Sequence, residues 1–204
     1  MKKLREPQLL GATLSRRDLL KLGLISAAGI SVSTAVQTAQ LQATPSCDDG
    51  DEPTVSQTEG PFYTPDTPER TSLLEAGISG TPLLVVGKVL DTSCQPVAGA
   101  LLDFWHADDS GAYDNVGYRL RGHQFSSETG EFRLETIVPG LYAGRTRHIH
   151  VKVQKPYGQL LTSQLYFPGE PGNTRDRIFD ESLVMDLSEA ADGGKNAVFN
   201  FVLS

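Results

Sequence analysis

Glu-Phe-Arg-Leu-Glu-Thr, at residues 131–136, gives the clearest indication of the fold, because charged side chains alternate with Phe132, Leu134 and Thr136. Successive side chains of a β-strand point to opposite faces, so this period of two predicts a strand with one face on a core. The sequence His-Ile-His-Val-Lys-Val at residues 148–153 alternates in the same way. Both stretches therefore predict strands.

Short strand-like runs separated by turn residues continue on both sides of these two stretches. We expect strands at residues 83–90, 98–106, 131–136, 148–153, 160–167, 182–187 and 197–203, with one more beginning near residue 123. The last two form a hairpin through residues 192–196. With 204 residues and no long amphipathic helix, the chain is predicted to be all-β, with one antiparallel β-sandwich of about seven to eight strands over residues 83–204. Residues 44–82 are rich in Pro, Thr, Asp and Glu and are predicted to form an irregular N-terminal arm over it.

The first 43 residues carry six basic and two acidic side chains, and an apolar stretch at residues 22–36 follows the basic ones. This order is typical of an export signal, and the apolar stretch is too short to span a membrane. Arg16 and Arg17, in Ser-Arg-Arg-Asp-Leu-Leu-Lys, indicate a twin-arginine signal read by the Tat export machinery. We predict that residues 1–43 are removed and that the mature protein is periplasmic or secreted, without a membrane span. The alternative is a basic amphipathic helix of the mature protein.

The net charge and the cysteines further limit the possible functions. The formal net charge of -7 argues against nucleic acid as a partner, because a surface that binds phosphates must be basic. The chain has two cysteines, Cys47 and Cys94, whose spacing does not resemble a zinc site. After export they form either one disulfide or two unpaired thiols.

The four histidines differ in what their surroundings indicate. His148 and His150 share one face of their predicted strand, with Cα atoms roughly 6.6 Å apart, so both imidazoles can reach one metal ion. A surface pair or a structural pair remains an alternative at this point. His106 follows an apolar strand and is predicted to be a hydrogen-bonded structural residue, whereas His123 is expected to be exposed.

Six motifs, taken together and in order, resemble the intradiol ring-cleavage dioxygenases. They lie at residues 58–63, 103–108, 111–113, 139–142, 145–150 and 164–167. The resemblance covers residues 56–203 and implies a β-sandwich enzyme that uses dioxygen to cleave a catechol-type aromatic diol between its two hydroxyls. The product is a muconate-type diacid.

The resemblance also implies one non-haem iron(III) ion per chain, held by two tyrosines and two histidines. By motif, these ligands are Tyr113, Tyr142, His148 and His150. Phenolate is a hard anionic donor that favours iron(III), and neutral imidazoles complete the set. In the family the tyrosine corresponding to Tyr142 leaves the metal when the substrate binds.

Three further residues correspond to the family's substrate pocket. They are Arg145 beside the substrate ring, Gln164 in the same pocket, and Pro61 in a segment that lines it. A fixed cation such as Arg145 stabilises negative charge on the ring.

Several alternatives remain open from the sequence. The chain could be an exported β-sandwich binding module without catalysis, or a zinc hydrolase, although the latter lacks a third ligand in the motif. Tyr118 is a rival to Tyr113 as a ligand, and Arg147 faces either a substrate carboxylate or a salt-bridge partner. The helical N-terminal segment of the soluble bacterial catechol dioxygenases does not fit before Glu59, so the chain resembles the short, exported members. The choice of catechol and the oligomeric state stay open.

Overall fold

A computed structural model of the chain describes residues 52–142 and 144–204. The predicted export signal and Cys47 lie outside these residues, so the signal and the Cys47–Cys94 pairing stay predictions. The described residues form nine strands: β1 (Pro82–Asp91), β2 (Leu101–Trp105), β3 (Arg121–Phe125), β4 (Glu131–Ile137), β5 (His148–Gln154), β6 (Leu160–Tyr166), β7 (Asp186–Glu189), β8 (Lys195–Val198) and β9 (Phe201–Leu203). One short 3-10 helix, η2, spans Glu181–Leu183. None of the helices in this part of the chain is long and apolar enough to cross a membrane.

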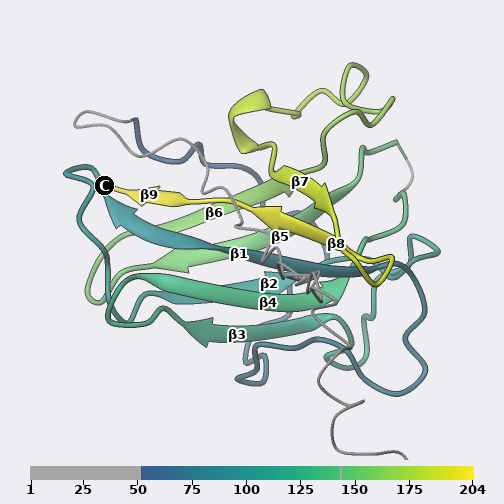
Figure 1. The fold of residues 1–204 in the computed structure, drawn as a ribbon, viewed down its shortest axis with the longest axis horizontal. Helices are drawn as coiled ribbons and strands as arrows, with labels where there is room; N and C mark the ends of the chain where they lie inside the picture. The colour runs from purple at the N-terminus through teal and green to yellow at the C-terminus, as the bar shows by residue number, and fades with distance from the viewer. Residues whose placement is uncertain (1–51, 143) are drawn as a thin grey trace, which may run out of the picture. The chain divides into compact units, whose positions relative to one another are not determined.

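The strands form two sheets, as Figure 1 shows. One sheet has the order β4-β1-β8-β7, with β9 also paired to β1, and the other has the order β3-β2-β5-β6. The predicted all-β sandwich is therefore confirmed, with nine strands in place of seven or eight.

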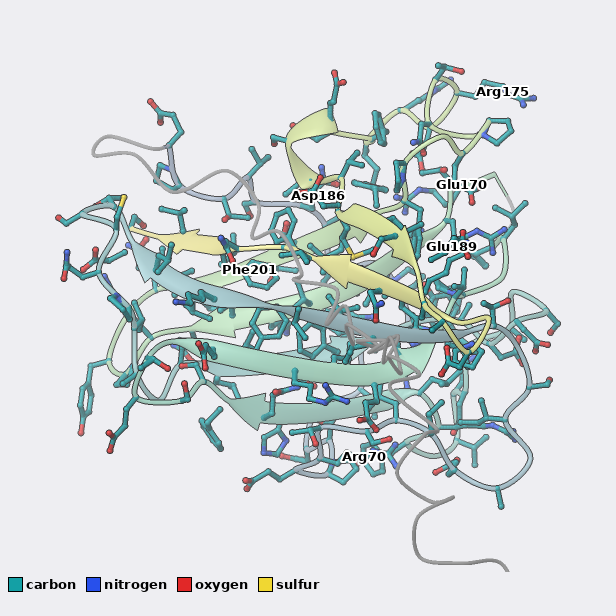
Figure 2. All side chains as sticks on the ribbon, in the orientation of Figure 1. Arg70, Glu170, Arg175, Asp186, Glu189 and Phe201 are labelled. Atoms are coloured by element: carbon teal, nitrogen blue, oxygen red, sulfur yellow. The ribbon has the colours of Figure 1, made fainter. Side chains whose placement is uncertain are left out.

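The core lies between the inner faces of the sheets, where the period-two pattern places the apolar side chains. Phe132 and Leu134 of β4 are buried, and Arg133 between them is exposed on the other face. The Phe132 ring packs 5.9 Å from Phe104 of the second sheet and 5.6 Å from Phe201, measured between ring centroids. Figure 2 shows the side chains that fill the layer, and each large apolar side chain buried there stabilises the fold by about 1.5–3 kcal/mol.

The predicted C-terminal hairpin is present as β7 and β8, but the strand predicted at residues 197–203 is divided between β8 and β9. β7 pairs antiparallel with β8, while β8 and β9 both run parallel to β1, so this sheet is mixed. Strand pairing with β1 is interrupted between β8 and β9, where the chain comes unusually close to Gly87. The carbonyl oxygen of Phe199 lies only 1.7 Å from the position that a Cβ on Gly87 would take. The side chain of Asn200 then accepts the hydrogen bond from the Lys88 N–H, 2.9 Å away, in place of a backbone carbonyl.

Residues 52–81 contain no helix or strand and run along both sheets. The N–H of Thr54 donates to Val202 O at 2.9 Å, and that of Gln57 donates to Thr162 O at 2.7 Å. Farther along, Thr67 O lies 2.7 Å from Nδ1 of His123, so His123 is partly buried and hydrogen-bonded, and its predicted exposure was wrong. The course of this segment brings residues 58–63 beside β5.

Candidate active site

The site is built around two histidines on one face of β5. His148 and His150 are 4% and 3% exposed, and their Nε2 atoms lie 3.2 Å apart. In the sheet, His150 stands opposite Trp105 of β2 on one side and Gln164 of β6 on the other. The Trp105 ring stacks on His150, with centroids 4.8 Å apart and planes within 6°. Two neighbouring strands therefore fix the direction of the pair.

Both imidazoles are neutral and direct their Nε2 atoms toward the same point. Burial lowers the pKa of His148 to about 4 and holds the pKa of His150 well below its usual range. His148 Nδ1 lies 2.7 Å from Thr146 O, so Nδ1 carries the proton and Nε2 is left with its lone pair.

Two loops with close-packed glycines bring the tyrosines together. Gly111 precedes Tyr113, and a Cβ on it would meet Leu141 O at 2.1 Å. Gly140 precedes Tyr142, and its N–H donates to Asp108 O at 2.7 Å. The loops can approach this closely only because neither glycine has a side chain, and Gly111 also has a φ of +88°.

The Tyr113 side chain lies at the histidine pair, and the Tyr142 ring lies against Tyr113. Tyr113 Oη lies 3.3 Å from His148 Nε2, and the rings of Tyr113 and Tyr142 meet edge to face with centroids 5.7 Å apart. Phe62 packs on both rings, stacked on Tyr113 at 4.4 Å and edge-on to Tyr142 at 5.2 Å. Burial raises the pKa of Tyr113 to about 12, so its phenol ionises at neutral pH only beside a strong cation.

This donor set fits a ferric ion. Three groups converge, namely the Nε2 atoms of His148 and His150 and the Tyr113 oxygen. Among residues 52–142 and 144–204, no three His, Cys, Asp or Glu side chains are grouped to hold a metal, and the Tyr113 phenol at His148 is a candidate anionic ligand. Two phenolates and two imidazoles are suited to iron(III) and less suited to zinc.

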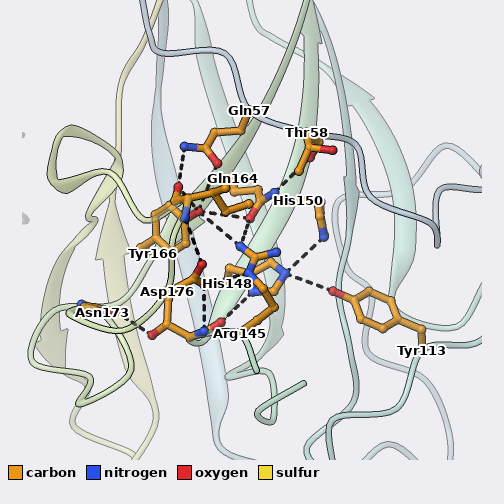
Figure 3. Close-up of polar contacts among 12 residues, drawn as sticks. Gln57, Thr58, Tyr113, Arg145, His148, His150, Gln164, Tyr166, Asn173 and Asp176 are labelled. Atoms are coloured by element: carbon orange, nitrogen blue, oxygen red, sulfur yellow. Dashed lines mark hydrogen bonds and ion pairs between the residues drawn. The ribbon is translucent and has the colours of Figure 1, made fainter. Parts of the chain in front are cut away.

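A charged network lies beside the histidines (Figure 3). Arg145 donates from Nη2 to Gln164 Oε1 at 2.7 Å and from Nε to Asp176 Oδ2 at 2.7 Å. Gln164 is fully buried and donates to Thr58 O at 2.9 Å. Burial raises the pKa of Asp176, but hydrogen bonds from the Thr146 N–H and Arg145 outweigh burial, so the pKa is lowered and the carboxyl is ionised. The structure thus brings together Arg145 and Gln164, which sequence motifs placed in one pocket.

Three other residues take positions that the sequence left open. Arg147 donates to Glu170 Oε1 at 2.8 Å and to the carbonyl of Pro139, which is the salt-bridge alternative. Tyr118 donates to Pro65 O at 3.2 Å, which leaves Tyr113 as the tyrosine at the histidine pair. Pro61 is exposed, between Phe62 at the tyrosine rings and Gly60, where a Cβ would lie 3.4 Å from His150 Cε1.

His106 is a buried structural residue, as the sequence predicted. Its Nδ1 lies 2.7 Å from Ala107 O and its Nε2 lies 2.6 Å from Thr136 Oγ1, an arrangement that a neutral ring satisfies. Burial lowers its pKa to about 4.

This shift predicts acid destabilisation. Between pH 6.5 and 4 the unfolded state binds a proton at His106 that the folded state does not, so stability falls as pH falls through this window. From pH 7.5 to 5 the contribution is about 2 kcal/mol. Urea unfolding of the metal-free protein at the two pH values measures it. His106→Gln should show a smaller pH-dependent loss than the parent, and an equal loss would contradict the assignment.

Several residues at the site gave no signal of their own in the sequence. Phe62, Trp105 and Thr146 lie within motifs, but nothing in their spacing assigns them a contact with the tyrosines or histidines. Asp176 lies in a polar loop, Asn-Thr-Arg-Asp-Arg, that indicates only an exposed turn. Their contacts join segments up to 80 residues apart, beyond the reach of local patterns.

Comparison with known proteins gives consistent matches. Residues 58–204 match the protein family described as "Dioxygenase". A curated relative, hydroxyquinol 1,2-dioxygenase of Rhizobium sp. (strain MTP-10005), is 28% identical over 172 residues, which are 70% of this chain and 58% of the relative. A second, 6-chlorohydroxyquinol 1,2-dioxygenase of Cupriavidus pinatubonensis, is 30% identical over 181 residues, covering 75% and 64%. The chain thus spans about three fifths of the length of these relatives.

Solved structures match over most of the described residues. The dioxygenase domain of a dioxygenase carbohydrate-binding protein fusion from Streptomyces sp. SirexAA-E is 54% identical, with a TM-score of 0.73, covering 75% of this chain and 99% of that domain. The 3-chlorocatechol 1,2-dioxygenase of Rhodococcus opacus 1CP is 29% identical, with a TM-score of 0.69, covering 74% and 72%.

Proposed function

Because the chain belongs to the intradiol ring-cleavage dioxygenase family, we propose that it cleaves a catechol-type aromatic diol with dioxygen. Both oxygen atoms enter the substrate, the ring opens between the two hydroxyls, and the product is a muconate-type diacid. The cofactor is one non-haem iron(III) ion per chain, with Tyr113, Tyr142, His148 and His150 as its ligands.

One observation carries this proposal above the others. The two neutral imidazoles and the Tyr113 oxygen converge within 3.3 Å, the Tyr142 ring adjoins Tyr113, and Arg145 lies beside them with its charge held by hydrogen bonds. A binding module has no reason to bury two adjacent imidazoles, because their desolvation costs free energy.

The residues of the site have distinct roles in the reaction. Iron(III) held by Tyr113, Tyr142, His148 and His150 would supply a Lewis acid that withdraws electron density from a bound diol and makes its ring reactive toward dioxygen. Tyr142, as the phenolate it would be when holding the metal, would accept one proton of the diol at Oη, and hydroxide from solvent would take the other, while Tyr113, anchored at His148, stays in place. The Arg145 guanidinium stabilises negative charge on the ring, and Gln164 holds that guanidinium toward the histidines. Phe62 packs against both phenol rings and excludes water from them.

The engagement of Arg147 bears on the choice of substrate. Its guanidinium is bound to Glu170 and to the carbonyl of Pro139, so it offers no free cation to a carboxylate on the ring. Two curated relatives act, by name, on hydroxyquinols. We infer that diols without a ring carboxylate are the substrates of this chain.

A substrate panel tests the function. The iron-loaded protein is mixed with catechol, hydroxyquinol, a chlorinated catechol or protocatechuate, and oxygen uptake is recorded. Uptake with the first three and slower uptake with protocatechuate are expected. No uptake with any diol by protein that holds iron would refute the proposed function, and fastest uptake with protocatechuate would refute only the inference from Arg147.

We also propose export by the twin-arginine route, which rests on residues outside the described part of the chain. If Arg16 and Arg17 are recognised, the domain folds and takes up iron before it crosses the membrane. Arg16→Lys with Arg17→Lys should then leave active enzyme inside the cell. Fractionation of a producing strain measures this, and undiminished export of active protein by the double variant would contradict the route.

A further inference from the structure

The carboxylate of Asp176 contacts both Arg145, which is proposed to act on the substrate, and Thr146, which contacts the proposed metal ligand His148. Its Oδ2 accepts hydrogen bonds from Arg145 Nε at 2.7 Å and from the Thr146 N–H at 2.9 Å. The side chain of Asp176 is only 3% exposed, and that of Arg145 is 20% exposed. A charge-assisted hydrogen bond in such surroundings is stronger than a surface ion pair.

Each of these two contacts leads on to a residue of the proposed reaction. Arg145, held through Nε, directs Nη2 to Gln164 Oε1. Thr146, held through its N–H, presents its carbonyl to Nδ1 of His148 at 2.7 Å and thereby fixes the tautomer and direction of that imidazole. One carboxylate oxygen thus contacts the cation beside the substrate ring and also Thr146, whose carbonyl orients a metal-facing histidine.

Hydrogen bonds hold the loop that contains Asp176 in place. It comprises residues 167–180, between β6 and η2, and we call it the β6–η2 loop. Asn173 of this loop accepts a hydrogen bond from Thr146 Oγ1 at 2.6 Å and donates to Phe167 O at 3.0 Å. The remaining oxygen of Asp176 accepts from the Ile178 N–H at 3.2 Å. Asp176 is therefore fixed at both oxygens.

We propose that Asp176 is a positioning residue that fixes the positions of Arg145 and His148 relative to each other. This inference rests on the function proposed above. Asp176 touches neither substrate nor metal and acts through Arg145 and Thr146. Its charge keeps Arg145 extended, because without that charge the guanidinium has only the neutral oxygens of Gln164 and Tyr166 as partners. Its removal also takes away one of the hydrogen bonds that hold Thr146, whose carbonyl orients His148.

The chain offers a matched control. Glu170 lies in the same loop and pairs with Arg147, two residues from Arg145, at 2.8 Å. That pair does not lead to His148 or Gln164, and its side chains are 23% and 21% exposed. Asp176→Asn and Glu170→Gln therefore make the same chemical change in neighbouring ion pairs. Only the first alters the proposed positions of Arg145 and His148 relative to each other.

Kinetics and iron retention of the two variants give one test. Asp176→Asn should lower kcat by about 10–100-fold with little change in KM, because Arg145 acts on charge that develops after the substrate has bound. It should also lose iron faster to a competing chelator, while Asp176→Glu restores part of both properties. Glu170→Gln should stay within about threefold of the parent, as expected for a partly exposed pair. Equal behaviour of Asp176→Asn and Glu170→Gln would overturn the proposal.

Crystal structures of the two variants without metal separate this proposal from the proposed function. In Asp176→Asn the contact between Arg145 Nη2 and Gln164 Oε1 should be lost, and in Glu170→Gln it should be kept. An unchanged contact in both variants would overturn the positioning role, whatever the enzyme's activity. A parent protein that retains iron but cleaves no diol would instead refute the proposed function, and the two crystal structures would still decide the role of Asp176.

Discussion

His148→Ala and His150→Ala should each abolish iron retention and with it the cleavage of diols. Each variant removes one of four proposed ligands, and the remaining imidazole loses the neighbour whose Nε2 lies 3.2 Å away. The loss of iron affinity should exceed the roughly 10–100-fold that the loss of a supporting outer residue costs. Metal analysis of purified protein after gel filtration measures the effect.

The control for these two variants is His123→Ala. His123 is also partly buried and hydrogen-bonded, to Thr67, but it stands outside the tyrosine and histidine cluster. It should therefore keep its iron. Full iron occupancy and full activity in either His148→Ala or His150→Ala would contradict the assignment of the site.

Tyr142→Phe should keep some iron and some visible colour but lose turnover by about 100-fold or more, because one base for the diol protons is gone. Tyr113 remains in this variant, with its oxygen at His148, and should still give a tyrosinate-to-iron(III) charge-transfer band. Tyr113→Phe should instead remove the band that persists in the substrate complex. Visible spectra with and without a catechol under anaerobic conditions distinguish the two.

Tyr118→Phe provides the matched control for the tyrosine variants. Its hydroxyl donates to Pro65 O away from the histidines, so this variant should keep the spectrum and the rate of the parent. If Tyr142→Phe turned over as fast as Tyr118→Phe, the proposed exchange of Tyr142 for substrate would be wrong.

Local patterns predicted the strands wherever one face of a strand lies on the core. β4 and β5 were placed within a residue of their observed ends because their side chains alternate cleanly. The division of the C-terminal strand into β8 and β9 was not predicted because it depends on Gly87, more than a hundred residues away, which lets the carbonyl of Phe199 approach β1. A contact of this kind leaves no periodic trace in either segment.

The residues of the site likewise divide into those that local patterns predict and those whose position depends on distant contacts. The spacing of His148 and His150 on one strand predicted that both imidazoles share a face, because this depends only on strand geometry. Tyr113 and Arg145 were assigned by resemblance to a family, since their meeting with the histidines depends on loops and neighbouring strands. Asp176 could be found only in the folded structure, because its role consists of two hydrogen bonds to a segment thirty residues earlier in the chain.

We propose that this chain opens a catechol ring between its hydroxyls and inserts both atoms of dioxygen. The most direct test is turnover of catechol by the iron-loaded protein under ¹⁸O₂, with the product identified by mass spectrometry. The proposed function predicts a muconate-type diacid that carries one labelled oxygen in each new carboxyl group. A ring-opened aldehyde, or a product that carries no label, would contradict it.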